Sequence, residues 1–468
     1  MIIPLVISEL HADLIQSKYS IVDLLNAYFE RIESYDKKLN CFITLTKDKA
    51  YEEAERCDKI LKDSGPDAFK DYPLLGVTVS YKDLFLTQGV RTTAGSRVLE
   101  NYIPSYSATV VEALENAGSI MIGKTNCDAW AHGASCENSD YGPTKNPWNT
   151  DYVPGGSSSG SAAAIAANFS LVATGTDTGG SIRQPASFCG MVGFKPTYGA
   201  VSRYGIVAMA SSLDSIGHFT RCIDDCERVF SVTKQLDYHD ATQANFPKSA
   251  NLASKPLIGL PKEYFIGGID AEVKENVLHA CEVFTKAGCK IEEISLPHTK
   301  YAIDVYYIIQ TAEVSSNLGR YDGIRFGNKR DAFGDEAKRR IMLGSYVLSA
   351  GYYDAYYLKA MKVRTKIIAD FDNVFNKVDA LIAPVSPTPA FKIGEKVDNP
   401  LSMYLADILT VAANLSGIPA ISFPFNATKN GLPLGFQIMG PRFSEDRLFG
   451  LAKTFEVSSK YKPKVAAL

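Results

Sequence analysis

The chain has 468 residues, of which 46% are apolar, and a formal net charge of −3. This length suits about two or three ordinary domains or one large α/β domain. A net charge this small creates no overall field that attracts nucleic acid. If a nucleic acid is bound, we therefore expect a partner to hold most of it. The nine cysteines are scattered without a C-x-x-C pair, which is typical of reduced thiols in a cytosol-like compartment.

The N-terminus reads M-I-I-P-L-V-I-S-E-L and soon meets Glu9 and Asp13. It lacks the basic region of a secretion signal and the arginines of a transit peptide. No apolar run is long enough to span a bilayer. We therefore expect a cytoplasmic protein that does not contact a membrane, with an organellar matrix as the alternative location.

Helices and strands alternate in the first part of the chain. Ser20 begins S-I-V-D, an N-cap pattern, and apolar residues then recur at helical spacing. We further predict a charged helix at 47–62, a strand at 73–80 that ends just before Lys82, a helix at 107–117 and a buried strand at 119–122.

A phosphate-loop pattern overlaps the last of these strands. Residues 118–125 read G-S-I-M-I-G-K-T, which satisfies G-x-x-x-x-G-K-[ST]. A phosphate loop needs a flexible turn whose amides curl around the phosphates, whereas the residues between these two glycines look like a strand. We therefore expect a strand end here and no bound ATP.

The stretch 154–183 carries most of the predicted chemistry. It reads P-G-G-S-S-S-G-S, continues through an alanine-rich segment predicted to be helical at 162–168, and ends in G-T-D-T-G-G-S-I-R. Glycines let a backbone approach a ligand closely, and serines offer hydroxyls as nucleophiles or relays. A Ser/Gly linker would not enclose an apolar helix. Gly156, Ser158 and Gly160 also fit G-x-S-x-G, the nucleophile motif of the α/β-hydrolases. That fold needs a downstream histidine as base, and the later histidines of this chain have no distinctive setting.

A serine nucleophile needs a base, and none of the six histidines lies in this stretch. The remaining candidate is a lysine kept neutral by burial, because desolvation lowers the pKa of a lysine. Lys82 lies in G-V-T-V-S-Y-K-D, just past the predicted strand. Asp177 and Arg183 flank the second serine cluster, and we interpret them as a structural ion pair.

The second half of the chain also alternates strands with helices. We predict strands at 256–260, 290–294, 378–383, 420–425 and 434–439, and helices at 271–287, 301–318, 336–347, 353–375, 402–413 and from Glu445. This alternation fits helices packed on a largely parallel or mixed sheet. The polar stretch 237–254 is predicted to be a surface excursion.

These motifs resemble those of the amidase signature family, whose Ser–cis-Ser–Lys triad matches Ser181, Ser157 and Lys82. G-K-T-N-C-D, E-N-S-D-Y-G-P-T-K-N-P-W and K-P-T-Y-G-A-V-S-R-Y-G extend the resemblance over nearly the whole chain, towards the tRNA-dependent branch of the family. The resemblance implies one large α/β domain, with a central mixed β-sheet flanked by helices on both faces. It further implies N-terminal helices at about 1–65, a signature core at about 73–235 and a C-terminal substrate-pocket portion at about 255–468.

The resemblance implies acyl transfer, with Ser181 as nucleophile, Ser157 as proton relay and Lys82 as base. A tetrahedral oxyanion needs preorganised donors, and successive amides in a turn before a helix converge on an anion. The predicted oxyanion hole consists of the amides of Thr178, Gly179 and Gly180, together with that of Ser181.

For glutamine as substrate, the resemblance implies one residue for the α-carboxylate and two for the α-ammonium. Arg340 offers the guanidinium fork that suits a carboxylate, while Asp407 and Tyr306 suit an ammonium. Without the resemblance each would be an ordinary helix residue, and Tyr307 and Arg339 are the immediate competitors.

The function implied is that of a glutaminase subunit, which supplies ammonia for converting Glu-tRNA(Gln), Asp-tRNA(Asn) or both into the amide form. No metal or cofactor is expected in this chain. ATP and Mg²⁺ are expected to serve a partner B subunit, a kinase and transamidase, with a small C subunit or equivalent clamping the two. The alternative is a stand-alone amidase for small or aryl carboxamides, which would lack the clamp formed by Arg340 and Asp407.

Three features depart from the family pattern. Ser159 stands where the family usually has Gly, and His132 stands where this branch often has Met. His132 either lines the pocket or is a core histidine, and we favour the pocket. The segment 327–338 is shorter than in many relatives, which affects the surroundings of Arg340.

Overall fold

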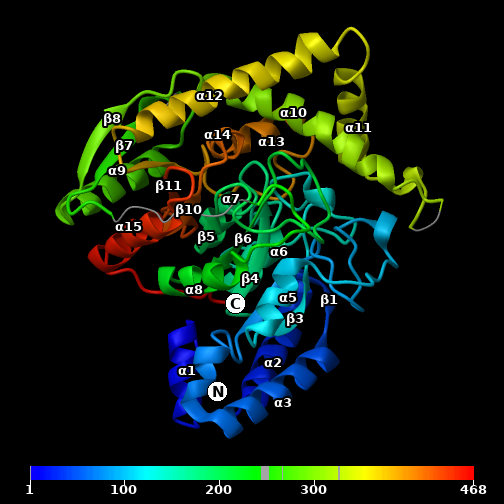
Figure 1. Cartoon of the computed structure of the whole chain (residues 1–468), viewed down its shortest axis with the longest axis vertical. Coiled ribbons are helices and arrows are strands. Elements are labelled where there is room, and N and C mark those ends of the chain that lie inside the picture. The colour runs from blue at the N-terminus through cyan, green and yellow to red at the C-terminus, as the bar shows by residue number, and fades with distance from the viewer. Residues whose placement is uncertain (1, 244–251, 266, 325–326) are drawn as a thin grey trace.

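The structure is a computed structural model that describes residues 2–243, 252–265, 267–324 and 327–468. One eleven-stranded sheet runs through this part of the chain in the order β1-β3-β2-β4-β6-β5-β10-β11-β9-β7-β8. Strands β2 and β7 each pair in parallel with both of their neighbours, and all other neighbouring strands pair antiparallel. Helices flank the sheet (Figure 1). The predicted single α/β domain with a central mixed sheet is confirmed.

The elements have the following bounds. The strands are β1 (Phe42–Leu45), β2 (Thr78–Lys82), β3 (Ile120–Thr125), β4 (Val172–Asp177), β5 (Val192–Lys195), β6 (Ser215–Thr220), β7 (Leu257–Pro261), β8 (Lys290–Ile294), β9 (Ala380–Pro384), β10 (Ala420–Ala427) and β11 (Pro433–Met439). The helices are α1 (Ile7–Ile15), α2 (Ile21–Leu39), α3 (Lys47–Ser64), α4 (Ala68–Asp71), α5 (Thr109–Asn116), α6 (Ser159–Ala166), α7 (Arg183–Cys189), α8 (Ile223–Thr233), α9 (Ala271–Lys286), α10 (Ala302–Asn317), α11 (Asp335–Val347), α12 (Lys359–Phe375), α13 (Pro400–Tyr404), α14 (Val411–Ser416) and α15 (Glu445–Ser458).

The N-terminal helices α1 to α3 form the lower end of the molecule in Figure 1. The predicted N-cap of α2 is confirmed, because the Ser20 hydroxyl accepts from the Asp23 amide at 3.0 Å and the Asp23 carboxylate accepts from the Ser20 amide at 3.0 Å. The apolar face of α2 is buried in the main core, as its helical spacing indicated.

The predicted strand at 73–80 is wrong at both ends. A turn occupies its first residues, in which the Val77 amide donates to the Leu74 carbonyl and Gly76 takes a φ of +75°. The strand β2 therefore begins at Thr78, and it includes Lys82 as its last residue. Lys82 thus lies on the sheet itself and not beyond it.

The strand prediction at 119–122 is confirmed and extended, since β3 continues through Thr125. The G-K-T letters of the phosphate-loop pattern therefore lie in a strand, where the backbone cannot curl around a phosphate. The Lys124 ammonium is buried, donates to the Thr92 hydroxyl at 2.8 Å and lies 3.6 Å from the Asp83 carboxylate. Its role is to hold the segment after β2 against β3.

The predicted helix at 402–413 is wrong, because the chain forms three short pieces there. Helix α13 ends at Tyr404, a 3₁₀ turn follows at Leu405–Asp407, and α14 begins at Val411. The Thr410 hydroxyl oxygen lies 3.0 Å from the Asp407 carbonyl oxygen within the break. Likewise, a π-helical turn at Tyr353–Leu358 precedes α12, so the predicted helix at 353–375 is α-helical only from Lys359.

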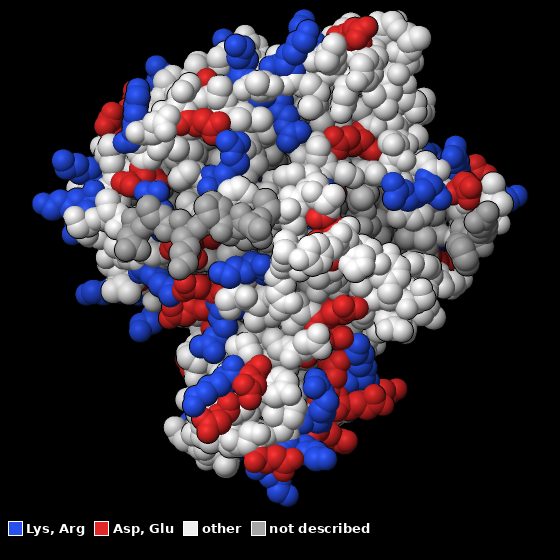
Figure 2. All heavy atoms as spheres, in the orientation of Figure 1, with Lys and Arg blue, Asp and Glu red and all other residues white. Residues whose placement is uncertain are grey.

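The face of the molecule seen in Figure 2 mixes both signs of charge. Figure 2 shows Lys and Arg interspersed with Asp and Glu on the visible face. Of the predicted surface excursion 237–254, residues 244–251 lie outside the described residues, while Asp240 at its start is buried and pairs with Arg203 at 2.8 Å. None of the helices in the described part of the chain is long and apolar enough to cross a bilayer.

Candidate active site

Two neighbouring parallel strands bring the polar residues of the site together. Strand β2 pairs with β4 in parallel, with Ser80 opposite Ala173, so the carboxyl ends of both strands lie at one edge. Lys82 ends β2 and Asp177 ends β4. The chain then turns through residues 178–182 into α7, and we call this segment the nucleophile turn.

Lys82 is fully buried, with an exposed fraction of 0%. Its Nζ lies 2.8 Å from the Ser157 Oγ, 3.0 Å from the Ser158 Oγ and 2.8 Å from the Thr176 Oγ1. Burial lowers the pKa of Lys82 from its ordinary value of 10.5 to about 8, against nearby thiol and carboxyl groups that favour the charged form. The peptide bond between Gly156 and Ser157 is cis, as the resemblance implied.

The hydrogen-bond pattern around Lys82 suits a neutral amine, which has two hydrogens to donate and one lone pair. The Ser158 hydroxyl donates to the Thr176 carbonyl at 3.3 Å, so it can only accept from Lys82. The Ser157 hydroxyl makes no other hydrogen bond to a described residue. Ser157 is therefore free to give its proton to the lone pair of Lys82.

Ser181 lies in the nucleophile turn and is 9% exposed. Its carbonyl accepts from the Ser158 amide at 3.2 Å, which ties the turn to the segment that carries Ser157. Its hydroxyl bonds to no described residue. The structure thus joins Lys82 and Ser157 directly, while Ser181 is attached to them through the backbone; in unliganded enzymes catalytic hydrogen bonds are often long and tighten when substrate binds.

The predicted oxyanion hole is corrected at Gly180. Its amide donates to the Asp177 Oδ1 at 2.9 Å, so it is not available to a substrate oxygen. The amides of Gly179 and Ser181 donate to no described residue, and neither does that of Thr178. The Gly179 carbonyl accepts from the Thr410 hydroxyl, and this contact fixes the orientation of the Gly179–Gly180 peptide.

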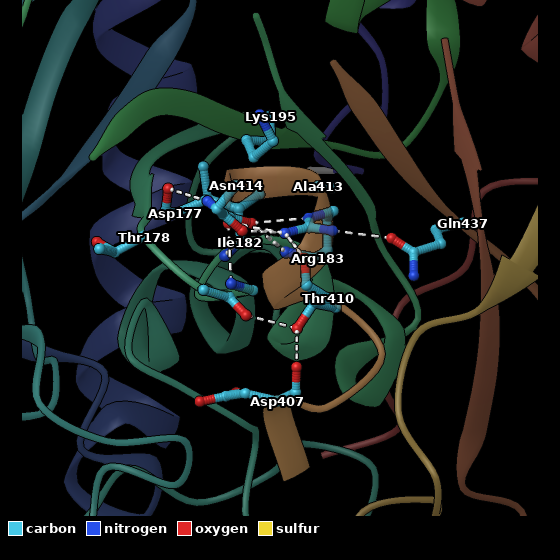
Figure 3. Close-up of polar contacts among 12 residues, drawn as sticks. Asp177, Thr178, Ile182, Arg183, Lys195, Asp407, Thr410, Ala413, Asn414 and Gln437 are labelled. Atoms are coloured by element: carbon cyan, nitrogen blue, oxygen red, sulfur yellow. Dashed lines mark hydrogen bonds and ion pairs between the residues drawn. The ribbon is translucent and has the colours of Figure 1, made fainter. Parts of the chain in front are cut away.

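A buried ion pair lies beneath the turn, and Figure 3 shows its contacts. The Arg183 Nη2 lies 3.0 Å from the Asp177 Oδ1 and donates to the Thr410 carbonyl at 3.0 Å and to Asn414 at 2.7 Å. Its Nη1 donates to Gln437 at 2.8 Å. Burial opposes ionisation of Asp177, but Arg183 outweighs it and brings the pKa to about 2. The predicted ion pair is confirmed, and it links the nucleophile turn to the segment 407–414.

Arg340 is 3% exposed, on the inward face of α11. Its Nε donates to the Glu336 Oε1 at 2.7 Å, and the ring of Tyr404 lies 5.6 Å from the guanidinium carbon. The two terminal nitrogens of this guanidinium bond to no described residue, so one edge of the fork is open. Arg339 instead points outward and pairs with the other Glu336 oxygen.

Tyr306 and Asp407 approach the nucleophile turn from two different elements. The Tyr306 ring, on α10, lies so close that a Cβ at Gly179 would be 2.7 Å from its hydroxyl oxygen. The Asp407 carboxylate has no hydrogen-bond partner among the described residues, and burial raises its pKa to about 8 against the lowering effect of Arg340. Thr410 couples this segment to the turn, since its hydroxyl contacts both the Asp407 and the Gly179 carbonyls.

Arg340 also lines a cavity of about 460 Å³. Asp128, His132, Glu336, Arg340 and Tyr404 line it. The Asp128 amide donates to the Ser157 carbonyl at 3.3 Å, so one wall of the cavity is attached to the triad. The described residues contain no group of three His, Cys, Asp or Glu side chains that could hold a metal ion.

Several residues around the site were not predicted from the sequence. Glu336 stands four positions before Arg340 on a predicted helix, and this spacing is itself a signal for an ion pair. The Gly180 contact also had a local signal, because an Asp side chain commonly accepts from amides shortly after it. Thr176 and Thr410 had none, since their partners are far away in the sequence.

Comparison with known proteins gives a consistent assignment over the full length. The Amidase family model matches residues 23–449. The chain is 49% identical to a protein of Trichlorobacter lovleyi, with 99% of each chain covered, and 51% identical to one of Carboxydothermus hydrogenoformans, with 94% of each covered; both are named as the A subunit of glutamyl-tRNA(Gln) amidotransferase. The crystal structure of the Thermotoga maritima protein of that name aligns with a TM-score of 0.80 at 41% identity, covering 96% of this chain and 95% of the other.

Proposed function

The chain belongs to the amidase family, and from this premise we propose that it is the glutamine-hydrolysing component of a tRNA-dependent amidotransferase. The observation that carries the chemistry is the buried Lys82 amine, 2.8 Å from the Ser157 hydroxyl and beside the turn that presents Ser181. The full-length identity to proteins named as the A subunit of glutamyl-tRNA(Gln) amidotransferase supports the choice of substrate over that of a stand-alone amidase.

The first chemical step is acylation of Ser181. Lys82 takes the proton of Ser157, and Ser157 takes that of Ser181, whose oxygen attacks the carboxamide carbon of glutamine. The carbonyl oxygen becomes an oxyanion, and the free amides of Gly179 and Ser181, with that of Thr178, are the donors that we assign to it. These donors cost no reorganisation, because Thr410 and Asp177 already fix the Gly179–Gly180 peptide, which lies between the Gly179 and Ser181 amides.

The second half of the reaction returns the proton. The tetrahedral intermediate collapses as the amide nitrogen takes a proton from Ser157, which is restored by Lys82, and ammonia leaves. A water molecule then attacks the glutamyl ester with the same relay as base, and glutamate and free Ser181 result. Lys82 begins and ends each half-reaction neutral, which its lowered pKa favours.

Recognition of glutamine requires opposite charges for its two α-substituents. The open edge of the Arg340 fork suits the α-carboxylate, because a guanidinium binds a carboxylate bidentately. The unpartnered Asp407 carboxylate and the Tyr306 hydroxyl suit the α-ammonium. An ammonium beside Asp407 would favour its ionised form and so lower its raised pKa.

The remaining steps belong to partners. We propose that ammonia passes to a B subunit that uses ATP and Mg²⁺ to activate Glu-tRNA(Gln) or Asp-tRNA(Asn), and that a small C subunit or equivalent holds the two together. The mixed charge of the face in Figure 2 and the net charge of −3 support tRNA binding mainly through the partner. We propose the cytoplasm as location, since aminoacyl-tRNA is used there.

The test is covalent labelling of the full chain, purified with the subunits that accompany it, by an electrophilic glutamine analogue. We expect peptide mass spectrometry to find the label on Ser181, and Ser181→Ala to abolish both labelling and glutamine hydrolysis. Ser161→Ala is the matched control, because this buried serine on α6 bonds to Thr125 and does not contact Lys82. A label on Ser157 or Ser158 would reverse the assignment of roles, and efficient turnover of aryl amides with negligible use of glutamine would favour a stand-alone amidase.

A further inference from the structure

His132 is a buried polar side chain whose ring has no partner. It is 1% exposed, and neither ring nitrogen has a hydrogen-bond partner among the described residues. A buried polar group left without a hydrogen bond is costly, and such groups in folded proteins call for an explanation. Since His132 lines the cavity that Arg340 also lines, the missing partner can be a ligand.

The backbone around His132 is anchored firmly. Its amide donates to the Ala129 carbonyl at 3.0 Å, and its carbonyl accepts from the Asn138 side chain. Trp130, two positions earlier, takes a φ of +59° and packs its ring against Tyr321 and Phe333, with ring centroids 4.8 and 5.2 Å away. These contacts hold the imidazole in place in the cavity wall without occupying either of its nitrogens.

The charge state of His132 limits what it can bind. Burial and then the nearby Arg340 lower its pKa well below the ordinary value. The neutral ring has one N–H to donate and one lone pair to accept with. Arg340, whose guanidinium has an open edge, lines the same cavity, so the N–H complements an anion that both groups can share.

We propose that His132 is a specificity-determining residue, which donates a ring N–H to the α-carboxylate that Arg340 binds. The ligand class is an amino-acid amide with a free α-carboxylate, so the inference rests on the proposed function. A carboxylate offers about four acceptor positions, and the bidentate guanidinium fills only about two of them. His132 supplies a further donor, where a methionine would supply none.

The experiment compares three amides that differ only at the α-carbon, on the full chain purified with its accompanying subunits. Glutamine carries both α-substituents, glutaramate keeps only the carboxylate, and 4-aminobutanamide keeps only the amine. The variants are His132→Met, which removes the donor at similar volume, and His132→Gln, which restores an N–H. His11→Met is the control, because His11 is a buried histidine on α1, far from the cavity, whose Nε2 contacts the Leu75 carbonyl.

We expect His132→Met to lower kcat/KM for glutamine and glutaramate by on the order of 10- to 100-fold, chiefly through KM, and to spare 4-aminobutanamide. His132→Gln should recover part of the loss, and His11→Met should leave all three substrates unchanged. Equal losses on all three would mean that His132 only supports the fold. A loss for glutamine and 4-aminobutanamide alone would mean that it accepts from the ammonium instead. Either result overturns the inference while leaving the proposed function intact, whereas a wild-type complex that does not hydrolyse glutamine would overturn both.

Discussion

The pH dependence of glutamine hydrolysis should report the pKa of Lys82 directly. Lys82 acts as a base only when neutral, and burial sets its pKa at about 8. At pH 7 about a tenth of the lysine is then neutral, against roughly 0.03% for a lysine with the ordinary value of 10.5. At saturating glutamine the bound α-ammonium keeps Asp407 ionised, so the log of kcat should rise about one unit per pH unit below pH 8 and level off above it.

Replacement of Lys82 by arginine should remove this activity. Arginine keeps the positive charge but stays protonated throughout the accessible pH range, so it cannot take the proton of Ser157. We expect Lys82→Arg to lower kcat by on the order of 10³-fold, the typical contribution of a positioned base. Lys195→Met is the control, because Lys195 is also buried with a pKa lowered to about 7 but does not contact the serines. The activity of this variant should still rise with pH and level off near pH 8.

Unfolding experiments provide a second measurement of the same shift. The folded-state pKa of Lys82 lies below that of the unfolded chain, so the unfolded chain binds the extra proton between pH 8 and 10.5. The contribution of Lys82 to the free energy of unfolding therefore rises with pH through this window, by about 3 kcal/mol for a shift from 10.5 to about 8. In urea unfolding, the change in stability from pH 8 to 10.5 should be about 3 kcal/mol less favourable for Lys82→Met than for the wild type, because the other buried lysines and thiols titrate in both proteins. Wild-type activity that keeps rising until above pH 10, or near-normal turnover by Lys82→Arg, would refute the proposed relay.

The other contacts of the site lead to three further predictions. Thr410→Val should lower kcat about tenfold with little change in KM, because it frees the Gly179 carbonyl, whereas Thr410→Ser should retain activity; steady-state kinetics check both. Arg340→Gln should lower kcat/KM for glutamine by on the order of 100-fold and affect 4-aminobutanamide much less, and equal losses would assign Arg340 to the fold. Arg183→Met should lower the free energy of unfolding at pH 7 by about 3–5 kcal/mol, since it leaves Asp177 buried without its partner; an unchanged urea midpoint would contradict this.

The features that the sequence predicts well are those with local signals. The helix after Ser20 has its cap and its apolar stripe within one segment, and the alternation of strands and helices is visible in the composition of each segment. No motif predicted the bounds of α1, which lies within the N-terminal helices that the resemblance implied, because it has no side-chain cap of its own. The Ile7 amide at its start donates instead to the Asp225 carboxylate at 3.0 Å, far along the chain.

Short strands were missed for a related reason. Strand β5 has only four residues, V-G-F-K, and their pattern is too brief to indicate a strand. It exists because β10 and β6 pair with it on either side. At the site, the motifs identified Lys82 and Ser157, but no local pattern indicated that Thr176 would share the lysine amine, since their contact depends on the parallel pairing of β2 with β4.

The break between α13 and α14 shows how a distant charge overrides local helix preference. The sequence through this region reads as one helix, yet the chain bends between Asp407 and Thr410. The Arg183 guanidinium, 227 positions earlier, donates to the Thr410 carbonyl from the buried ion pair with Asp177. A buried guanidinium needs acceptors for its donors, because each one left unmade is costly. The bend therefore supplies the Thr410 carbonyl as an acceptor to the ion pair. It also brings the Thr410 hydroxyl to the Gly179 carbonyl, and this contact holds the segment that carries Asp407 against the nucleophile turn.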